Sequence, residues 1–167
     1  MKKVTIIYGS TSGNTQNVAK MIANKIQYIN PKAKDVKEVT SADLQEADVL
    51  ILGTSTWGYG DIQDDWENYL PELEKSNLEG KTIAIFGLGD SDSYSDTFVN
   101  GMAAIYNTIK NMKCTIVGEV STDDYTFDDS ESVIDGNFIG LALNEDGESD
   151  KTEERITNWL ETIKKYL

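Results

Sequence analysis

The sequence predicts an α/β protein built on a three-layer, doubly wound, five-stranded parallel sheet whose last strand is split by an insertion. Near-continuous apolar runs, typical of strands covered on both faces, alternate along the chain with amphipathic helical patterns. This βαβ order requires right-handed crossovers and places helices on both faces of the sheet. Because no linker or internal repeat interrupts the 167 residues, we expect one domain over residues 1–167.

Strands are expected first where apolar residues run together. The runs at residues 4–8, 49–53 and 82–87 end at small residues and predict the buried strands of a parallel sheet. A weaker run at residues 35–39 predicts a strand near an edge.

Helices are expected between these strands, where apolar residues recur at helical spacing. Such stripes occupy residues 18–26, 98–112 and 156–166, and each predicts a helix face packed on the core. Residues 65–74 are helical in their first turns, and we expect Pro71 to limit or kink that helix.

The last third of the chain is less regular. Residues 115–120 and 138–143 both have the pattern of a strand, and residues 121–135 between them are acidic and rich in turn formers. The simplest interpretation is one strand position interrupted by a loop of about 20 residues, a length at which loops in compact domains are usually functional or disordered.

The composition excludes several kinds of chemistry. There is no His, and the single cysteine, Cys114, cannot form an intrachain disulfide or a multi-cysteine metal site, so we expect no metal and a packing role for this thiol. Carboxylates, hydroxyls, backbone groups or a cofactor must therefore carry the chemistry. No apolar run could span a bilayer and a strand begins almost at the N-terminus, so we expect no signal peptide and a cytoplasmic protein.

The net charge of −14, from 29 acidic and 15 basic residues, restricts the partners. It argues against nucleic acid or an anionic membrane, and it suits transient docking to a basic protein surface. A role in solubility alone explains the charge equally well.

Three loops follow the carboxyl ends of the predicted strands, which meet at one edge of the sheet. Residues 9–15 crowd small and hydroxyl residues before a helix, so loop amides and the helix dipole favour a phosphate there. Residues 54–61 contain Trp57, and residues 87–94 contain Tyr94. Two aromatic side chains beside a phosphate site suit a flat ring system held between them.

Other phosphate motifs do not match this first loop. A Walker loop needs Lys after its last glycine, where Asn14 stands, and the dinucleotide spacing G-x-G-x-x-G is absent. A receiver domain needs an Asp at the end of the third strand, where Gly53 and Thr54 stand. Because the loop contains no Lys or Arg, we predict a monophosphate held by hydroxyls and amides.

Together these loops resemble those of the flavodoxins, specifically the long-chain group with a split last strand. The likeness runs from Lys3 to the final helix. The motifs that carry it are the phosphate loop STSGNT (10–15), the second flavin loop TWGYG (56–60) with DDW (64–66), the third loop GLGD (87–90) with Tyr94 and Phe98, and the segment GNFIGLALNED (136–146) that closes the insertion.

The resemblance implies non-covalently bound FMN and a monomeric, non-enzymatic carrier that passes single electrons at low potential between basic redox proteins. An FMN-dependent NAD(P)H or quinone oxidoreductase on the same fold is the alternative, and a maturation partner for a metalloenzyme is a third class. No catalytic residues are implied. The cofactor-binding residues implied are Ser10, Thr11, Ser12, Gly13, Asn14, Thr15, Ser55, Thr56, Trp57, Gly58, Tyr59, Gly60, Gly87, Leu88, Gly89, Asp90, Tyr94, Phe98 and Asp146.

Two positions depart from the family pattern. Ser91 replaces a Gln found in many relatives, so we expect a contact near the flavin edge to be absent or bridged by water. Gly58 replaces a bulkier residue, and glycine eases the peptide flip by which the family's carbonyl accepts a hydrogen bond from protonated flavin N5. We therefore expect Gly58 to stabilise the one-electron-reduced form, and Asp90 and Asp146 to lower the potential for the second electron.

Two acidic regions each have two interpretations. Asp61, Asp64, Asp65 and Glu67 form part of a docking rim for basic partners, or they are simply acids favoured by a helix dipole. The insertion at residues 121–135 serves partners, or it packs over the last strand.

Overall fold

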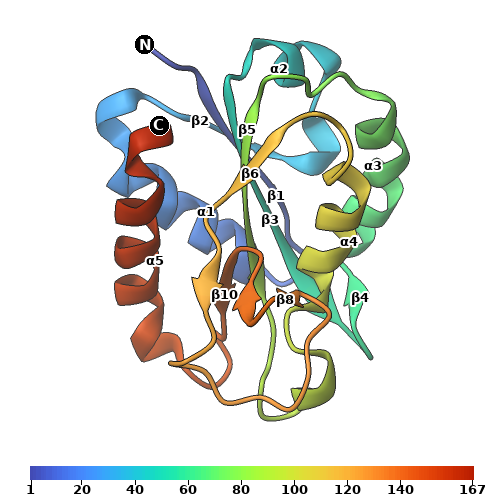
Figure 1. Ribbon diagram of the computed structural model, residues 1–167, viewed down its shortest axis with the longest axis vertical. Coiled ribbons are helices and arrows are strands. Elements are labelled where there is room, and N and C mark those ends of the chain that lie inside the picture. The colour runs from blue at the N-terminus through green and yellow to red at the C-terminus, as the bar shows by residue number, and fades with distance from the viewer.

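A twisted parallel sheet forms the centre of the computed structural model, which describes residues 1–167 (Figure 1). Its strand order is β10-β5-β3-β1-β2, with β6 also paired to β5 and the short β4 antiparallel to the end of β3. The strands are β1 Val4–Gly9, β2 Lys32–Asp35, β3 Val49–Trp57, β4 Asp61–Ile62, β5 Thr82–Leu88, β6 Thr115–Val117 and β10 Leu141–Leu143.

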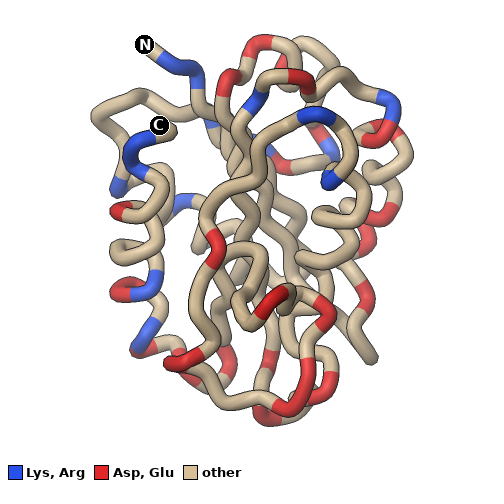
Figure 2. The backbone as a smooth tube through the Cα atoms, in the orientation of Figure 1, with Lys and Arg blue, Asp and Glu red and all other residues tan.

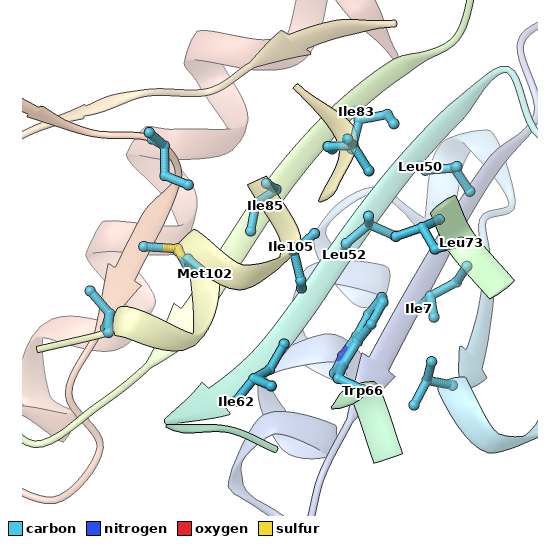
Figure 3. Close-up of a cluster of buried hydrophobic side chains, with 14 of the residues drawn as sticks. Ile7, Leu50, Leu52, Ile62, Trp66, Leu73, Ile83, Ile85, Met102 and Ile105 are labelled. Atoms are coloured by element: carbon cyan, nitrogen blue, oxygen red, sulfur yellow. The ribbon is translucent and has the colours of Figure 1, made fainter. Parts of the chain in front are cut away.

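Helices cover both faces of the sheet and make the three predicted layers. One core cluster joins the strands to α1 and α5, and a second joins them to α2, α3 and α4. In the second cluster, Trp66 and Leu73 of α3 pack against Leu52 of β3 (Figure 3). The helices are α1 Asn14–Lys25, α2 Ser41–Glu46, α3 Asp64–Lys75, α4 Asn100–Ile109 and α5 Ser149–Ile163. None of these helices is both long enough and apolar enough to cross a membrane.

The last strand position is split, as predicted. β6 pairs with the first residues of β5, from Thr82 to Ala84, and β10 pairs with its last residues, from Phe86 to Leu88. The chain between them forms a small antiparallel sheet of β7 Val120–Ser121, β8 Val133–Ile134 and β9 Asn137–Phe138.

The insertion packs on the scaffold through aromatic side chains. Tyr125 and Phe127 lie against Phe98 and Phe138, with ring centroids 4.9–6.2 Å apart. The Tyr125 hydroxyl donates to the Ala142 carbonyl at 2.8 Å, and burial raises its pKa to about 12. These contacts support the packing interpretation of the insertion.

The expected edge strand is present, but it lies at Lys32–Asp35, so the bounds 35–39 are wrong. β2 ends at Asp35, whose carboxylate accepts the amide of Lys37 at 2.9 Å, and residues Val36–Glu38 form a 3-10 turn. The Asp side chain thus gives the backbone a local alternative to the strand, while the turn buries Val36. Pro71 also does not end α3, which continues to Lys75 with Leu73 fully buried in the core.

Candidate functional site

A cavity of about 370 Å³ opens at the carboxyl edge of the sheet, where the three predicted loops meet. The segments around it follow β1, β3, β5 and β10, so the doubly wound topology brings distant parts of the chain to one place. Its lining residues are Ser12, Asn14, Thr15, Ser55, Thr56, Trp57, Gly58, Leu88, Gly89, Asp90, Tyr94, Thr97, Glu145 and Asp146.

The N-terminus of α1 forms one end of this cavity. Gly13 precedes the helix in the left-handed region, at φ 99°, and the Ser10 hydroxyl accepts its amide at 3.1 Å. No side chain caps α1 and its first turn holds no acid, so its first amides keep their capacity to bind an anion. A Cβ on Gly13 would meet nothing within 4 Å, so the space beside this residue is open.

Two half-exposed aromatic side chains line the cavity from different loops. Trp57, at the end of β3, is 43% exposed, and its indole NH donates to the Ser55 hydroxyl at 2.8 Å. Tyr94 is 46% exposed, and its amide donates to the Asp90 carbonyl at 3.0 Å. The first contact orients the indole, and the second closes the loop that carries Tyr94.

A tight turn after Trp57 carries the glycine singled out in the sequence. The Gly60 amide donates to the Trp57 carbonyl at 3.2 Å, and Gly58 has φ 53°. The φ of Tyr59 is not positive, so the φ signs at the two central residues, Gly58 and Tyr59, are those of a type II′ turn. A Cβ at Gly58 would meet only the Asp61 carboxylate, at 3.4 Å, so backbone strain and not crowding would oppose a larger residue.

The cavity is acidic. Asp90, Glu145 and Asp146 line it, and no Lys or Arg does. The Asp90 carboxylate accepts the amides of Ser93 and Asp92, each at 3.0 Å. The Ser93 amide is the main cause that holds the pKa of Asp90 below its usual value.

The structure brings most of the predicted site residues to the cavity wall and places the others around it. Ser10 shapes the first loop, and the Thr11 hydroxyl accepts the Gln63 side-chain amide at 3.3 Å. Tyr59 is 91% exposed, with its ring edge-on to Tyr94 at 6.4 Å. The other predicted residues that do not line the cavity are Gly13, Gly60, Gly87 and Phe98.

Phe98 lies elsewhere because the insertion covers it. It is 1% exposed, in contact with the aromatic side chains of the insertion, and α4 begins two residues later. Sequence reasoning missed Thr97 and Glu145, which do line the cavity. The position of Glu145 beside Asp146 was an available signal, whereas Thr97 sits on a 3-10 turn that no pattern predicted.

A larger cavity, of about 650 Å³, lies at the sheet edge between α4, β6 and α5. None of the three site loops reaches it, and no helix N-terminus lines it. The smaller cavity is therefore the candidate site, because it alone combines free helix amides with aromatic walls.

The fold and the site define a doubly wound α/β protein whose sheet-edge cavity suits an anionic ligand that carries a flat ring. Comparison with known proteins identifies the family. The flavodoxin family model matches residues 6–159. The chain is 39% identical to a flavodoxin of Buchnera aphidicola, over 100% of this chain and 98% of the relative, and 40% identical to one of Helicobacter pylori, over 98% of each.

Solved structures agree. The flavodoxin of Fusobacterium nucleatum, whose crystal structure is bound to flavin mononucleotide, superposes with a TM-score of 0.95 at 29% identity, over 100% of this chain and 99% of that one. The chain belongs to the flavodoxin family, whose members are electron-transfer proteins.

Proposed function

We propose that this protein is a low-potential, one-electron carrier that binds FMN non-covalently and moves electrons between basic redox proteins. One observation carries the proposal: the uncapped N-terminus of α1 and the aromatic pair Trp57 and Tyr94 open onto the same cavity. FMN joins a phosphate to a flat tricyclic ring. The N-terminus of α1 suits the phosphate, and the two aromatic side chains suit the ring.

The donors around α1 fit a monophosphate. Ser12, Asn14 and Thr15 line the cavity beside the free helix amides, and none carries a positive charge. Neutral hydroxyls and amides, together with the helix dipole, suffice for one dianion without a lysine or a metal ion. Trp57 and Tyr94 would cover the ring, and they would exclude water from its faces.

FMN supplies the one-electron chemistry when it is bound, and the chain sets how readily each electron is accepted. With FMN bound, the Gly58 carbonyl would serve as a hydrogen-bond acceptor for the ring, because glycine tolerates the positive φ that this turn already has. Asp90, Glu145 and Asp146 oppose any added negative charge on the ring. These two effects favour the first electron over the second.

Acidic residues around the site would attract the basic partners. Figure 2 shows Asp and Glu concentrated at the end of the molecule that holds the insertion and the carboxyl ends of the strands, with many lysines at the opposite end near both termini. Asp61 pairs with Trp57 between β3 and β4, and Asp64 and Asp65 follow in the first turn of α3. Opposite charge would speed encounter and orient the flavin edge toward the partner.

Reconstitution tests the cofactor. The apoprotein should bind FMN and turn yellow, and anaerobic dithionite titration should show two resolved one-electron steps. Failure to bind FMN would refute the proposal, and bleaching in a single two-electron step, or turnover with NAD(P)H alone, would refute the carrier role.

Charge reversal tests the docking surface separately. An Asp61→Lys, Asp64→Lys variant should reduce a basic cytochrome more slowly in stopped-flow experiments, with a weaker dependence on salt. The control, Glu79→Lys, reverses a single exposed acid in a turn before β5, and each single reversal, Asp61→Lys and Asp64→Lys, is compared with it. Equal rates and equal salt slopes for wild type and all variants would exclude docking through the acidic rim.

A further inference from the structure

Two walls of the site cavity are joined by one buried side-chain hydrogen bond. The Asn144 side-chain amide donates to the Ser91 hydroxyl at 2.8 Å, across 53 positions of sequence. Asn144 is fully buried and Ser91 is 8% exposed, so water does not compete with the bond. Neither residue lines the cavity. Ser91 directly follows Asp90 and Asn144 directly precedes Glu145, and both Asp90 and Glu145 line it.

Asn144 also builds the turn on its own side of the cavity. Its side-chain oxygen accepts the Gly147 amide at 2.9 Å, and its carbonyl accepts the Glu148 amide at 2.8 Å. These bonds shape the turn that carries Glu145 and Asp146 into α5. The carboxylate of Glu145 also bonds to the Thr152 hydroxyl of that helix.

On the other side, Ser91 lies in a loop that is otherwise closed on itself. The Asp90 carboxylate accepts the Asp92 and Ser93 amides, and the Asp90 carbonyl accepts the Tyr94 amide. These bonds fix the shape of the loop but not its distance from the opposite wall. The pairing of β5 with β10 and the backbone bond from Gly89 to Leu143, at 3.0 Å, hold the two segments together at the strand ends. Beyond the strands, the Ser91–Asn144 bond joins the two walls.

We propose that Ser91 and Asn144 are positioning residues for the flavin site, whose hydrogen bond sets the gap between the Tyr94 wall and the Asp146 wall. The inference rests on the proposed function for its ligand, FMN. It gives Ser91 a role where the sequence suggested only a missing contact: the hydroxyl faces Asn144 and not the cavity. Without the bond, the buried Asn144 amide lacks its partner, and the two walls can separate.

The chain offers a matched control. Ser132 is buried too, and its hydroxyl donates to the Val99 carbonyl at 2.7 Å, but it lies in the insertion and does not line the cavity. Ser91→Ala and Ser132→Ala each remove one buried hydroxyl, so both should lower the thermal midpoint. Only Ser91→Ala should weaken FMN binding, by about tenfold, and shift the two one-electron potentials. Ser91→Thr, which keeps the hydroxyl, should restore affinity and potentials.

A measurement without FMN separates this inference from the proposed function. In the apoprotein, Ser91→Ala should speed amide hydrogen exchange in both 90–94 and 145–148, while Ser132→Ala should not. Unchanged exchange and unchanged potentials in Ser91→Ala, with normal FMN binding by wild type, would overturn the positioning role and leave the electron carrier intact. If wild type bound no FMN, the proposed function would fail, and paired loosening of the two segments would still support the contact as the link between the walls.

Discussion

Helices α1 and α3 begin at the same edge of the sheet, but only α3 has side chains that satisfy the amides of its first turn. At α3, the Gln63 side chain accepts the Trp66 amide at 3.1 Å, and Asp64, Asp65 and Glu67 complement the helix dipole. At α1, no side chain caps the helix and no acid lies in the first turn. The two termini are neighbours, since Gln63 also donates to Thr11.

This difference shows where the fold leaves room for a ligand. Buried or half-buried amides need acceptors, so a helix that does not supply its own requires water or a bound anion. Polar side chains satisfy the first amides of α3, whereas no side chain does so at α1. We therefore expect the N-terminus of α3 to be structural and that of α1 to bind the ligand, and the predictions below test that division.

The largest effect is expected from exchanging the first residues of the two helices. Asn14→Asp places an acid in the first turn of α1, in the wall of the cavity. At an assumed distance of ~10 Å and an effective dielectric of ~20, its repulsion of a dianion should cost about 3 kcal/mol, or roughly 100-fold in FMN affinity. The same acid should leave apoprotein stability unchanged or raise it by up to ~1 kcal/mol, because it complements the dipole. Fluorescence titration and thermal unfolding measure the two effects.

The mirror substitution, Asp64→Asn, is the control for this exchange. It removes an exposed acid from the first turn of α3 and should lower stability by less than ~1 kcal/mol without changing FMN affinity. If Asn14→Asp bound FMN as tightly as wild type, the phosphate could not lie at α1.

The N-terminus of α2 extends the comparison to a second self-completed helix. Thr40 and Asp43 form a reciprocal capping box, and the buried Asp43 carboxylate also accepts Lys34 at 2.8 Å and Lys32 at 3.1 Å. Asp43→Ala should lower the free energy of unfolding by about 2 kcal/mol while FMN affinity stays constant. Chemical denaturation of the apoprotein and FMN titration provide the test.

The pH dependence of this variant follows from the Asp43 pKa. The Lys34 ammonium, followed by the Thr40 amide, holds that pKa well below its usual range. A carboxyl with a depressed folded pKa contributes stability above its unfolded pKa of about 4, and the contribution is lost as pH falls toward the folded value. The difference in free energy of unfolding between wild type and Asp43→Ala should therefore be constant from pH 5 to 8, about one unit or more above the unfolded pKa. This difference should shrink on acidification. A gap that grew on acidification would contradict the assignment.

The sequence predicted which loops surround the cavity better than it predicted the contacts behind them, for a physical reason. Residues such as Gly13 and Trp57 are recognisable because their types are unusual after a buried strand, and strand order alone brings their loops together. Phe98 was misplaced because its burial depends on aromatic side chains of the insertion, which local periodicity does not locate. The Ser91–Asn144 contact likewise joins positions whose pairing only the folded chain shows.

The next prediction concerns the acids that line the cavity and their effect on the reduction potential. Asp146→Asn removes one negative charge near the ring, and at ~8 Å with an effective dielectric of ~20 this is worth about 2 kcal/mol, or about 90 mV, before screening. The second one-electron potential should rise by up to that amount at low salt and by less at high salt. Glu79→Gln is the control, since Glu79 is an exposed acid outside the cavity. A wild-type potential that did not change with ionic strength would contradict the charge argument.

The smallest effect is expected at Gly58, where the chain supplies a movable acceptor. Gly58→Val should hinder the turn of the following peptide, because φ is 53° and a branched side chain is strained there. Loss of one hydrogen bond to the proton at flavin N5 is worth ~1 kcal/mol, so the first one-electron potential should fall by about 40 mV. Gly80→Val is the matched control: Gly80 has φ 79° with open space around its Cβ, and it lies outside the cavity. Both variants should lose stability to backbone strain, but only Gly58→Val should move the potential. Equal potentials for wild type and both variants would mean that Gly58 merely shapes the turn after Trp57.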